Sequence, residues 1–386
     1  MNRPTPLGAT SLRSLAFLFL KLGFIGFGGP AAHIAMMEDE VVRRRGWLTR
    51  EEFLDLLGAT NLIPGPNSTE MAIHIGHRRC GALGLIVAGI CFIVPAMCIV
   101  LGCSWAYVRF GKLPQAEAIL YGIKPVIIAI VFQALWGFGR TALKSIFLGA
   151  VAAIALALYA AGMHELILLF GTGAVVAAAR LVGRPSSGAM PAILPFFVAA
   201  SGSAAAATAA SFSIPKLFLF FLKVGSVLFG SGYVLLAFLR ADLVERWGWL
   251  TEAQLLDAVA VGQVTPGPVF TTATFIGYLL GGVWGAVVAT IGIFLPAFIF
   301  VAISGPLVPR IRSSPAAGAF LDGVIVASLA VMAGVTWQLA SAAVVDVVTL
   351  ALALVSALLL FRYRLNSAWL VGGGAVAGLL KALFAN

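Results

Sequence analysis

The chain has 386 residues, of which 61% are hydrophobic and only 10% charged, with a mean hydropathy of +1.04 and a net charge of +10. This composition excludes a soluble globular protein, which carries far more charge, and predicts helices embedded in a lipid bilayer. The positive charge fits Lys and Arg in cytoplasmic loops. It does not indicate nucleic-acid binding, because no basic run is interleaved with aromatic residues on a polar surface.

The first apolar segment, 15–37, contains Lys21 and is interrupted by Phe27-Gly28-Gly29-Pro30. It has no small-residue cleavage site at its end, so we do not expect a removed signal peptide. A basic loop follows, and Thr49 with Glu52 predicts a capping box that starts a short amphipathic helix at Arg50. Further apolar segments lie at roughly 82–108, 116–139, 145–161, 164–182, 215–239, 253–280, 282–308, 318–341, 343–361 and 367–384.

These lengths predict an all-α polytopic membrane protein with about ten membrane-spanning segments plus broken or re-entrant hairpins. Residues 190–210 are apolar, rich in small residues and proline-bearing. They form either an extra span, which places the N-terminus inside, or a linker, which places it outside.

Two Pro-Gly-Pro sequences, at 64–66 and 266–268, each stand between apolar helical segments. Proline removes a backbone donor and glycine frees the chain, so neither sequence continues a helix. Within a membrane, irregular backbone survives only where protein or a water-filled cavity satisfies it. Broken helices at matching places in two halves are the best sequence indication of a transport site.

The two halves are a repeat. Adding 202 to positions 19–69 aligns 51 residues without a gap, of which 19 are identical, and the offset becomes 201 after one deletion. Lys21 then matches Lys223 and Asp55 matches Asp257. We therefore expect a first repeat at 1–184, a linker or extra span at 185–213, and a second repeat at 214–386.

Basic residues change sides between the repeats. Arg140 and Lys144 flank a turn whose counterpart at 341–346 has no basic residue, whereas Arg362 and Arg364 flank a turn whose counterpart at 162–165 has none. Under the positive-inside rule this pattern predicts opposite insertion of the two repeats, with the C-terminus outside. Arg109 and Lys112 are exceptions, because they fall on the outer side.

The breaks predict a site for a small oxyanion, since free N–H groups and the dipole at a helix N-terminus favour an anion. Hydroxyls and glycines near the breaks offer further donors, and equivalent lysines offer charge. The predicted substrate-binding residues are Lys21, Lys223, Gly28, Gly29, Gly230, Ser231, Gly65, Asn67, Ser68, Thr69, Gly267, Thr271 and Thr272. Glu70 and His33 are candidates for carrying a coupled proton.

Simpler interpretations stand beside these. Lys21 lies one or two turns inside its segment and can extend to the interface. His33 is more often a packed, hydrogen-bonded histidine than a proton carrier, and Glu70 can simply cap the helix that follows it. We expect Asp55 and Asp257 to pair with loop arginines. The glycine-rich run at 371–374 indicates helix packing.

Several stretches resemble the chromate ion transporter (CHR) family. They are Phe27-Gly28-Gly29-Pro30-Ala31-Ala32-His33-Ile34, Arg44-Arg45-Gly46-Trp47-Leu48, Pro64-Gly65-Pro66-Asn67-Ser68-Thr69-Glu70, and the second-half Phe229-Gly230-Ser231-Gly232-Tyr233 and Thr265-Pro266-Gly267-Pro268. The likeness covers essentially the whole chain and fits the long two-domain form. The second half has Gly-Ser-Gly where the family motif has Gly-Gly-Pro, so the two halves need not contribute equally.

The resemblance implies a secondary transporter that exports chromate across the bacterial inner membrane by proton-coupled antiport and confers chromate resistance. A carrier of sulfate or another tetrahedral oxyanion, or an anion channel, is the alternative. A membrane enzyme such as a chromate reductase has no support, because the sequence has no clustered metal ligands and no cofactor fingerprint. We expect no cofactor, no metal and no catalytic residues. The sequence does not define an oligomeric state, and a homodimer is one option.

Overall fold

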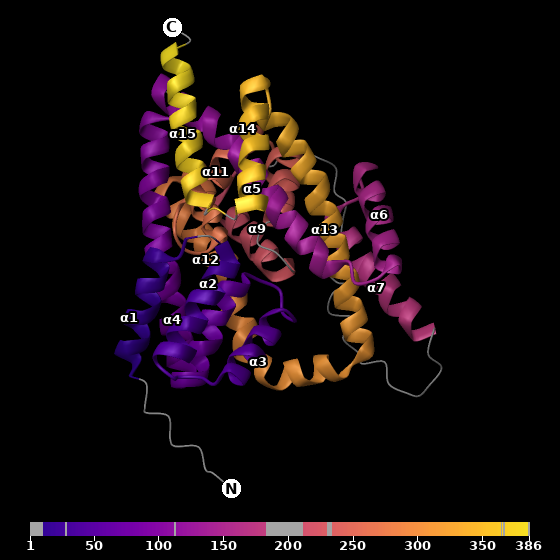
Figure 1. Ribbon diagram of the computed structural model, residues 1–386. Helices are drawn as coiled ribbons and strands as arrows, with labels where there is room; N and C mark the ends of the chain where they lie inside the picture. The colour runs from indigo at the N-terminus through magenta and orange to yellow at the C-terminus, as the bar shows by residue number, and fades with distance from the viewer. Residues whose placement is uncertain are drawn as a thin grey trace.

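The computed structural model describes residues 11–27, 29–111, 113–182, 211–229, 234–363, 365 and 367–384. Three of the predicted site residues, Gly28, Gly230 and Ser231, lie outside the described residues, as does the predicted span or linker at 190–210. Figure 1 shows the N-terminal helices gathered at one end of the molecule and the C-terminal helix reaching the other end.

The first half contains α1 (Leu12–Ile25), α2 (Gly29–Glu38), the π-helical turn η1 (Asp39–Arg44), α3 (Arg50–Thr60), α4 (Asn67–Phe110), α5 (Pro114–Ala142), α6 (Ile146–Ala160) and α7 (Glu165–Val182). The second half contains α9 (Ile214–Val227), α10 (Leu235–Phe238), the π-helical turn η3 (Leu239–Arg246), α11 (Glu252–Val264), the 3₁₀ turn η4 (Val269–Thr271), α12 (Thr272–Ser313), α13 (Pro315–Ala343), α14 (Val347–Leu358), η5 (Leu359–Tyr363) and α15 (Ser367–Phe384). The described residues form no β-strand.

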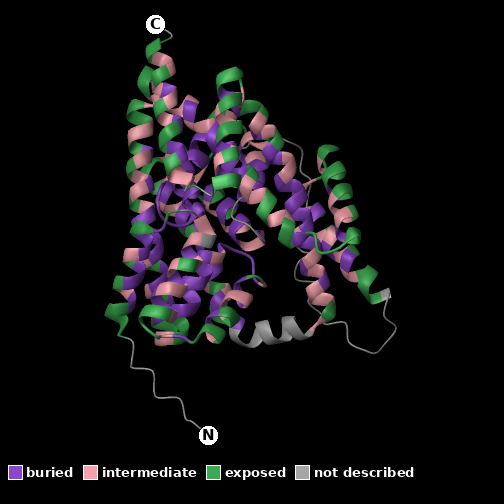
Figure 2. Ribbon diagram, viewed as in Figure 1, coloured by how far each residue is buried: buried purple, intermediate pink, exposed green. Residues whose placement is uncertain are grey.

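The prediction of an all-α polytopic membrane protein is confirmed. Five of the described helical segments, within α4, α5, α12, α13 and α15, are long and apolar enough to cross a membrane by length and composition. Large apolar side chains cover the outside of the bundle, among them Trp284, Trp337 and Trp369, each at least 76% exposed. Figure 2 shows the buried residues concentrated inside and the exposed ones on the outer helices. Such an apolar exterior suits lipid, not water.

Both α4 and α12 turn back on themselves. The backbone leaves the helical region at Cys80 and Gly81 in α4, and at Gly281 and Gly282 in α12. A Cβ added to Gly76 would lie 2.2 Å from the carbonyl oxygen of Gly84, although eight residues of straight helix span about 12 Å. The two arms of α4 are therefore antiparallel and in contact. The first arm has 13 residues, or about 20 Å, which is less than the thickness of a bilayer core.

An ion pair joins α3 to the first arm of α4, and these two helices form the first hairpin. Arg78, near the end of the first arm of α4, donates to Glu52 in the first turn of α3 at 2.8 Å, and this hydrogen bond holds the pKa of Glu52 below its ordinary value. The predicted capping box of Thr49 and Glu52 is present. Because α3 and the first arm of α4 are antiparallel, the Pro-Gly-Pro sequence between them forms the tip of the hairpin, and residues 63–66 are buried.

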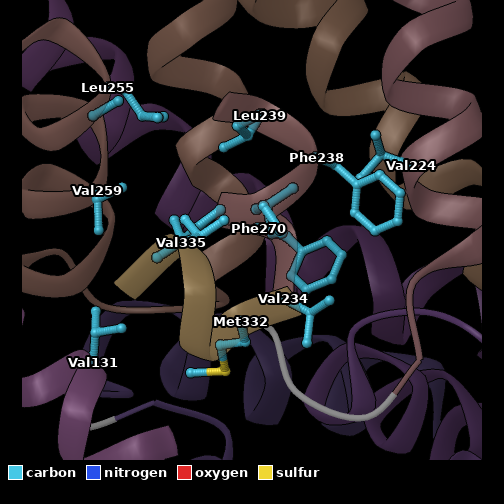
Figure 3. Packing of buried hydrophobic residues seen from close by; sticks show 14 of the residues in the cluster. Val131, Val224, Val234, Phe238, Leu239, Leu255, Val259, Phe270, Met332 and Val335 are labelled. Atoms are coloured by element: carbon cyan, nitrogen blue, oxygen red, sulfur yellow. The ribbon is translucent and has the colours of Figure 1, made fainter. Parts of the chain in front are cut away.

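The largest buried cluster surrounds the second break. Figure 3 shows Phe270, which follows that break, among Val234, Phe238 and the α13 residues Met332 and Val335. All five are at most 2% exposed. Burial of such side chains contributes roughly 1.5–3 kcal/mol each, so the core fixes the position of the break.

The outer helices exchange partners between the halves. α7 of the first half packs along α13, and α15 of the second half packs along α5. Gly122 in α5 meets the backbone of Gly374 in α15, which confirms that the glycine-rich run serves helix packing. Gly323 in α13, 201 residues after Gly122, meets Gly173 in α7 in the same way.

Candidate functional site

We call the Pro-Gly-Pro sequence at 64–66 the first break and that at 266–268 the second break, and each is hydrogen-bonded to the chain just after the first helix of the opposite half. The N–H of Gly65 donates to the carbonyl of Leu228, just after α9, at 2.8 Å. The N–H of Gly267 donates to the carbonyl of Gly26, just after α1, also at 2.8 Å. The donor glycines are 202 residues apart, and so are the acceptor residues. Each Pro-Gly-Pro sequence is therefore held by a carbonyl just after the first helix of the other half.

Both central glycines have positive φ, +141° at Gly65 and +93° at Gly267, which other residues rarely adopt. A Cβ on Gly65 would lie 2.3 Å from Oε1 of Glu70, and one on Gly267 would lie 2.3 Å from Cβ of Ala96. Only glycine therefore fits at either position. The contact also places the carboxyl group of Glu70 directly against the first break.

Buried polar atoms without a protein partner surround the first break. Among the described residues, Oγ1 of Thr69, both carboxyl oxygens of Glu70 and Nε2 of His74 have no hydrogen-bond partner. Their side chains are 0%, 0% and 6% exposed. Because buried polar groups are nearly always satisfied in native proteins, this cluster indicates a place for a polar ligand, a proton or water.

His33, in α2, lies at the carbonyl that holds the second break. Its Nε2 lies 2.8 Å from the carbonyl oxygen of Gly26, the same oxygen that accepts from Gly267. A carbonyl can only accept, so Nε2 carries the proton. Nδ1 is then an acceptor, and it is buried and unpartnered among the described residues.

The second break differs in its side chains. Oγ1 of Thr271 donates to the carbonyl of Pro268, and Oγ1 of Thr272 donates to that of Val269, both at 2.8 Å. Both hydroxyl protons are thus used locally. At the first break, a helix begins at Asn67, as predicted, and Asn67 donates to Asn61 across the break at 3.0 Å. The buried Ser68, 2% exposed, follows directly.

The two predicted lysines are each held by a carboxylate. Nζ of Lys21 lies 2.7 Å from Oε1 of Glu40, and Nζ of Lys223 lies 2.5 Å from Oδ2 of Asp242. Glu40 and Asp242 are themselves related by the offset of 202. The lysines keep 41% and 34% of their side chains exposed. In this state, direct coordination of an anion by either lysine requires its ion pair to open.

Sequence reasoning missed several buried or half-buried charges, among them Glu40, Asp242 and Lys124. Lys124, in the middle of α5, lies 3.0 Å from Oδ1 of Asp257, and Tyr107 in α4 donates to Oδ2 of Asp257 at 2.8 Å. The expectation that Asp257 pairs with a loop arginine is therefore wrong. The signal that could have found Lys124 is its position as the one lysine inside the predicted 116–139 span.

The described residues contain no group of three His, Cys, Asp or Glu side chains placed to hold a metal ion. Together, the apolar exterior, the short first arms of α4 and α12 and the buried polar helix ends are typical of membrane transport proteins.

The chain belongs to the chromate transporter family. The profile of this family, described as "Chromate transporter", matches residues 13–179 and again 215–379. The chromate transport protein of Cupriavidus metallidurans is 33% identical over 98% of both chains. The probable chromate transport protein of Synechococcus elongatus is 32% identical, over 94% of this chain and 91% of the relative. The chromate transport protein of Pseudomonas aeruginosa is 32% identical, over 94% of this chain and 90% of the relative. No solved structure matches the chain at a significant level.

Proposed function

We propose that this protein is a secondary active transporter that exports chromate in exchange for protons. It acts as a multi-pass protein of the bacterial inner membrane and confers chromate resistance. One observation carries the proposal, namely the cluster of buried, unpartnered polar atoms beside two crossed helix breaks inside an apolar bundle. The names of the relatives support chromate as the substrate, and the unpartnered polar atoms support a position for it at the first break.

The dianion is held at the first break. The first turn of α4 offers the N–H groups that a helix start leaves without intrahelical partners, together with the hydroxyls of Ser68 and Thr69. The second break contributes the N–H groups of Val269 and Phe270 at the start of η4, because Gly267 already donates to Gly26 and the threonine hydroxyls already donate to carbonyls. The positive charges of Lys21 and Lys223 attract the anion to the site. Each lysine also forms an ion pair with a carboxylate.

Glu70 carries the proton. Burying an unpaired carboxylate costs several kcal/mol, so the empty site closes only when Glu70 is neutral. The return of the empty carrier with a protonated Glu70 then moves a proton in the direction opposite to chromate. His33 is the second candidate, because its buried Nδ1 is free to accept.

The two repeats are inverted with respect to each other, and one rocks against the other to expose the site alternately. Three observations support this arrangement. The basic residues change sides between the halves, and the hydrogen bonds of Gly65 and Gly267 are reciprocal. In addition, α7 packs on α13, and its counterpart α15 packs on α5, the counterpart of α13.

Transport into proteoliposomes tests the proposal. Purified protein is reconstituted, and uptake of labelled chromate is followed with a pH gradient of either sign. We expect uptake above that of empty liposomes, driven by a gradient that moves protons out of the vesicle as chromate enters. No uptake by a folded protein would reject the function, and stimulation only by the opposite gradient would reject antiport.

Competition separates the alternatives. Unlabelled chromate, sulfate or molybdate is added in excess during uptake of labelled chromate. We expect unlabelled chromate to inhibit the uptake most strongly. Stronger inhibition by sulfate would make the protein a sulfate carrier, and a single-channel conductance far above carrier rates would make it an anion channel.

A further inference from the structure

We propose that Lys124, Asp257 and Tyr107 form a latch that shuts one of the two access routes to the site, and that the structure is the state in which this route is closed and the route along α3 is open. The inference rests on the proposed transport, since a carrier needs two routes that open alternately. It adds the residues that hold one of them shut.

Matched positions of the two hairpins differ in exposure. Phe53 in α3 and its counterpart Leu255 in α11 are both buried, at 1% and 0%. The next position does not match, because Leu54 is 53% exposed and its counterpart Leu256 is 2% exposed. The two helices thus pack alike on their inner side, and only α11 is covered on its other side.

The open side of α3 faces water. Leu54 and Asp55 share it with Asn61, two turns further on, and all three are exposed. A face that carries an aspartate and an asparagine is unsuited to lipid. The counterpart Asp257 is 4% exposed, so the same face of α11 is covered at Leu256 and Asp257.

Helices from both repeats cover α11. It packs against α5, α13 and α15, whereas α3 packs chiefly against α4. The offset between the repeats pairs α5 with α13 and α7 with α15. The helices that correspond to the three neighbours of α11 are therefore α13, α5 and α7. In the opposite state, we therefore expect the open face of α3 to close on α13 and α7.

The latch connects three elements at the covered side. The Asp257 carboxylate on α11 contacts Lys124 on α5 through one oxygen and Tyr107 on α4 through the other, at 3.0 and 2.8 Å. Lys124 is 20% exposed and Asp257 is 5% exposed at the side chain. The position matching Lys124 is Ile325, so the second repeat has no lysine at the corresponding place. Opening the α11 route must separate the half-buried Lys124 from the buried Asp257.

Thiol labelling measures both routes without any substrate. Leu54→Cys and Leu256→Cys are made separately in a background without the four native cysteines. Each protein is placed in nanodiscs, so that a membrane-impermeant maleimide reaches both faces. With the latch intact, we expect Leu54→Cys to be labelled at least tenfold faster than Leu256→Cys.

The latch is then removed without leaving an unpaired charge, by Lys124→Gln together with Asp257→Asn. We expect labelling of Leu256→Cys to rise at least fivefold and that of Leu54→Cys to fall, because the population moves to the opposite state. The exchanged pair Lys124→Asp with Asp257→Lys should restore the original pattern. Lys144→Gln, which removes the 2.7 Å pair with Asp322 just beyond the C-terminal end of α5, should change neither rate.

Unchanged labelling in a double variant that remains monodisperse would overturn the latch. A rise at Leu256→Cys with no fall at Leu54→Cys would overturn it as well, because local loosening alone gives that result. Failure of the proposed function is distinguishable, since it abolishes chromate uptake and leaves these labelling rates as they are.

Discussion

Glu70 is fully buried at the start of α4, with neither carboxyl oxygen hydrogen-bonded among the described residues. Its position directly after the Pro-Gly-Pro sequence was predicted, because that motif fixes where the helix begins. Its isolation was not predictable, since a glutamate in a first turn usually caps its own helix. The pairing of Lys124 was not predictable either, because its partner lies 133 residues away in sequence.

Glu70→Gln should abolish the response of chromate transport to a pH gradient, because glutamine keeps the shape of the side chain and cannot take up a proton. We expect gradient-driven uptake into proteoliposomes to fall at least tenfold. Glu117→Gln, at an exposed position in the first turn of α5, is the control and should behave as the unmodified protein. An unaltered gradient response in a folded Glu70→Gln protein would return Glu70 to a structural role.

At the scale of elements, most helix limits followed from the sequence. The segment expected at 367–384 is α15, and the boundary expected before 82 is the reversal at Cys80 and Gly81. The segment expected at 215–239 was wrong, because α9 ends at Val227. Beyond Val227 its apolar residues are interrupted only by Gly230-Ser231-Gly232, and the match of this stretch to the first repeat indicated a break. The π-helical turns η1 and η3 had no sequence signal.

Gly122→Ala should destabilise the contact between α5 and α15. The added Cβ would lie 1.9 Å from the carbonyl oxygen of Gly374, so the helices must separate, at a cost of about 1–3 kcal/mol. We expect a lower midpoint of thermal unfolding in detergent. Gly137→Ala is the matched control in the same helix, because its Cβ would meet nothing within 4 Å. Equal midpoints would show that the close approach of the two glycines is not required.

At the scale of the whole molecule, the sequence predicted a membrane protein built from two related halves, and it predicted that their breaks belong to one site. Which atoms meet was not predictable. The bonds from Gly65 to Leu228 and from Gly267 to Gly26 join residues 163 and 241 positions apart. Hydrophobic periodicity describes each helix separately and holds no information on such pairs.

The exchange of contacts also explains why each half needs the other. Each Pro-Gly-Pro sequence is bound by a carbonyl from the opposite half, and the buried N–H of each central glycine would otherwise be unsatisfied. A half alone would therefore leave polar backbone exposed to lipid, which membranes do not tolerate.

Chromate binding to purified protein, measured by isothermal titration calorimetry, tests most directly whether the crossed breaks form the oxyanion site. Gly65→Ala places a methyl group against Glu70 at a φ of +141°, whereas Gly46→Ala places one at a φ of +57°, in the left-handed helical region, with nothing within 4 Å. We predict that Gly65→Ala weakens chromate binding at least tenfold, or about 1.4 kcal/mol, and that Gly46→Ala does not. A folded Gly65→Ala protein that binds chromate as tightly as the unmodified protein would contradict this site.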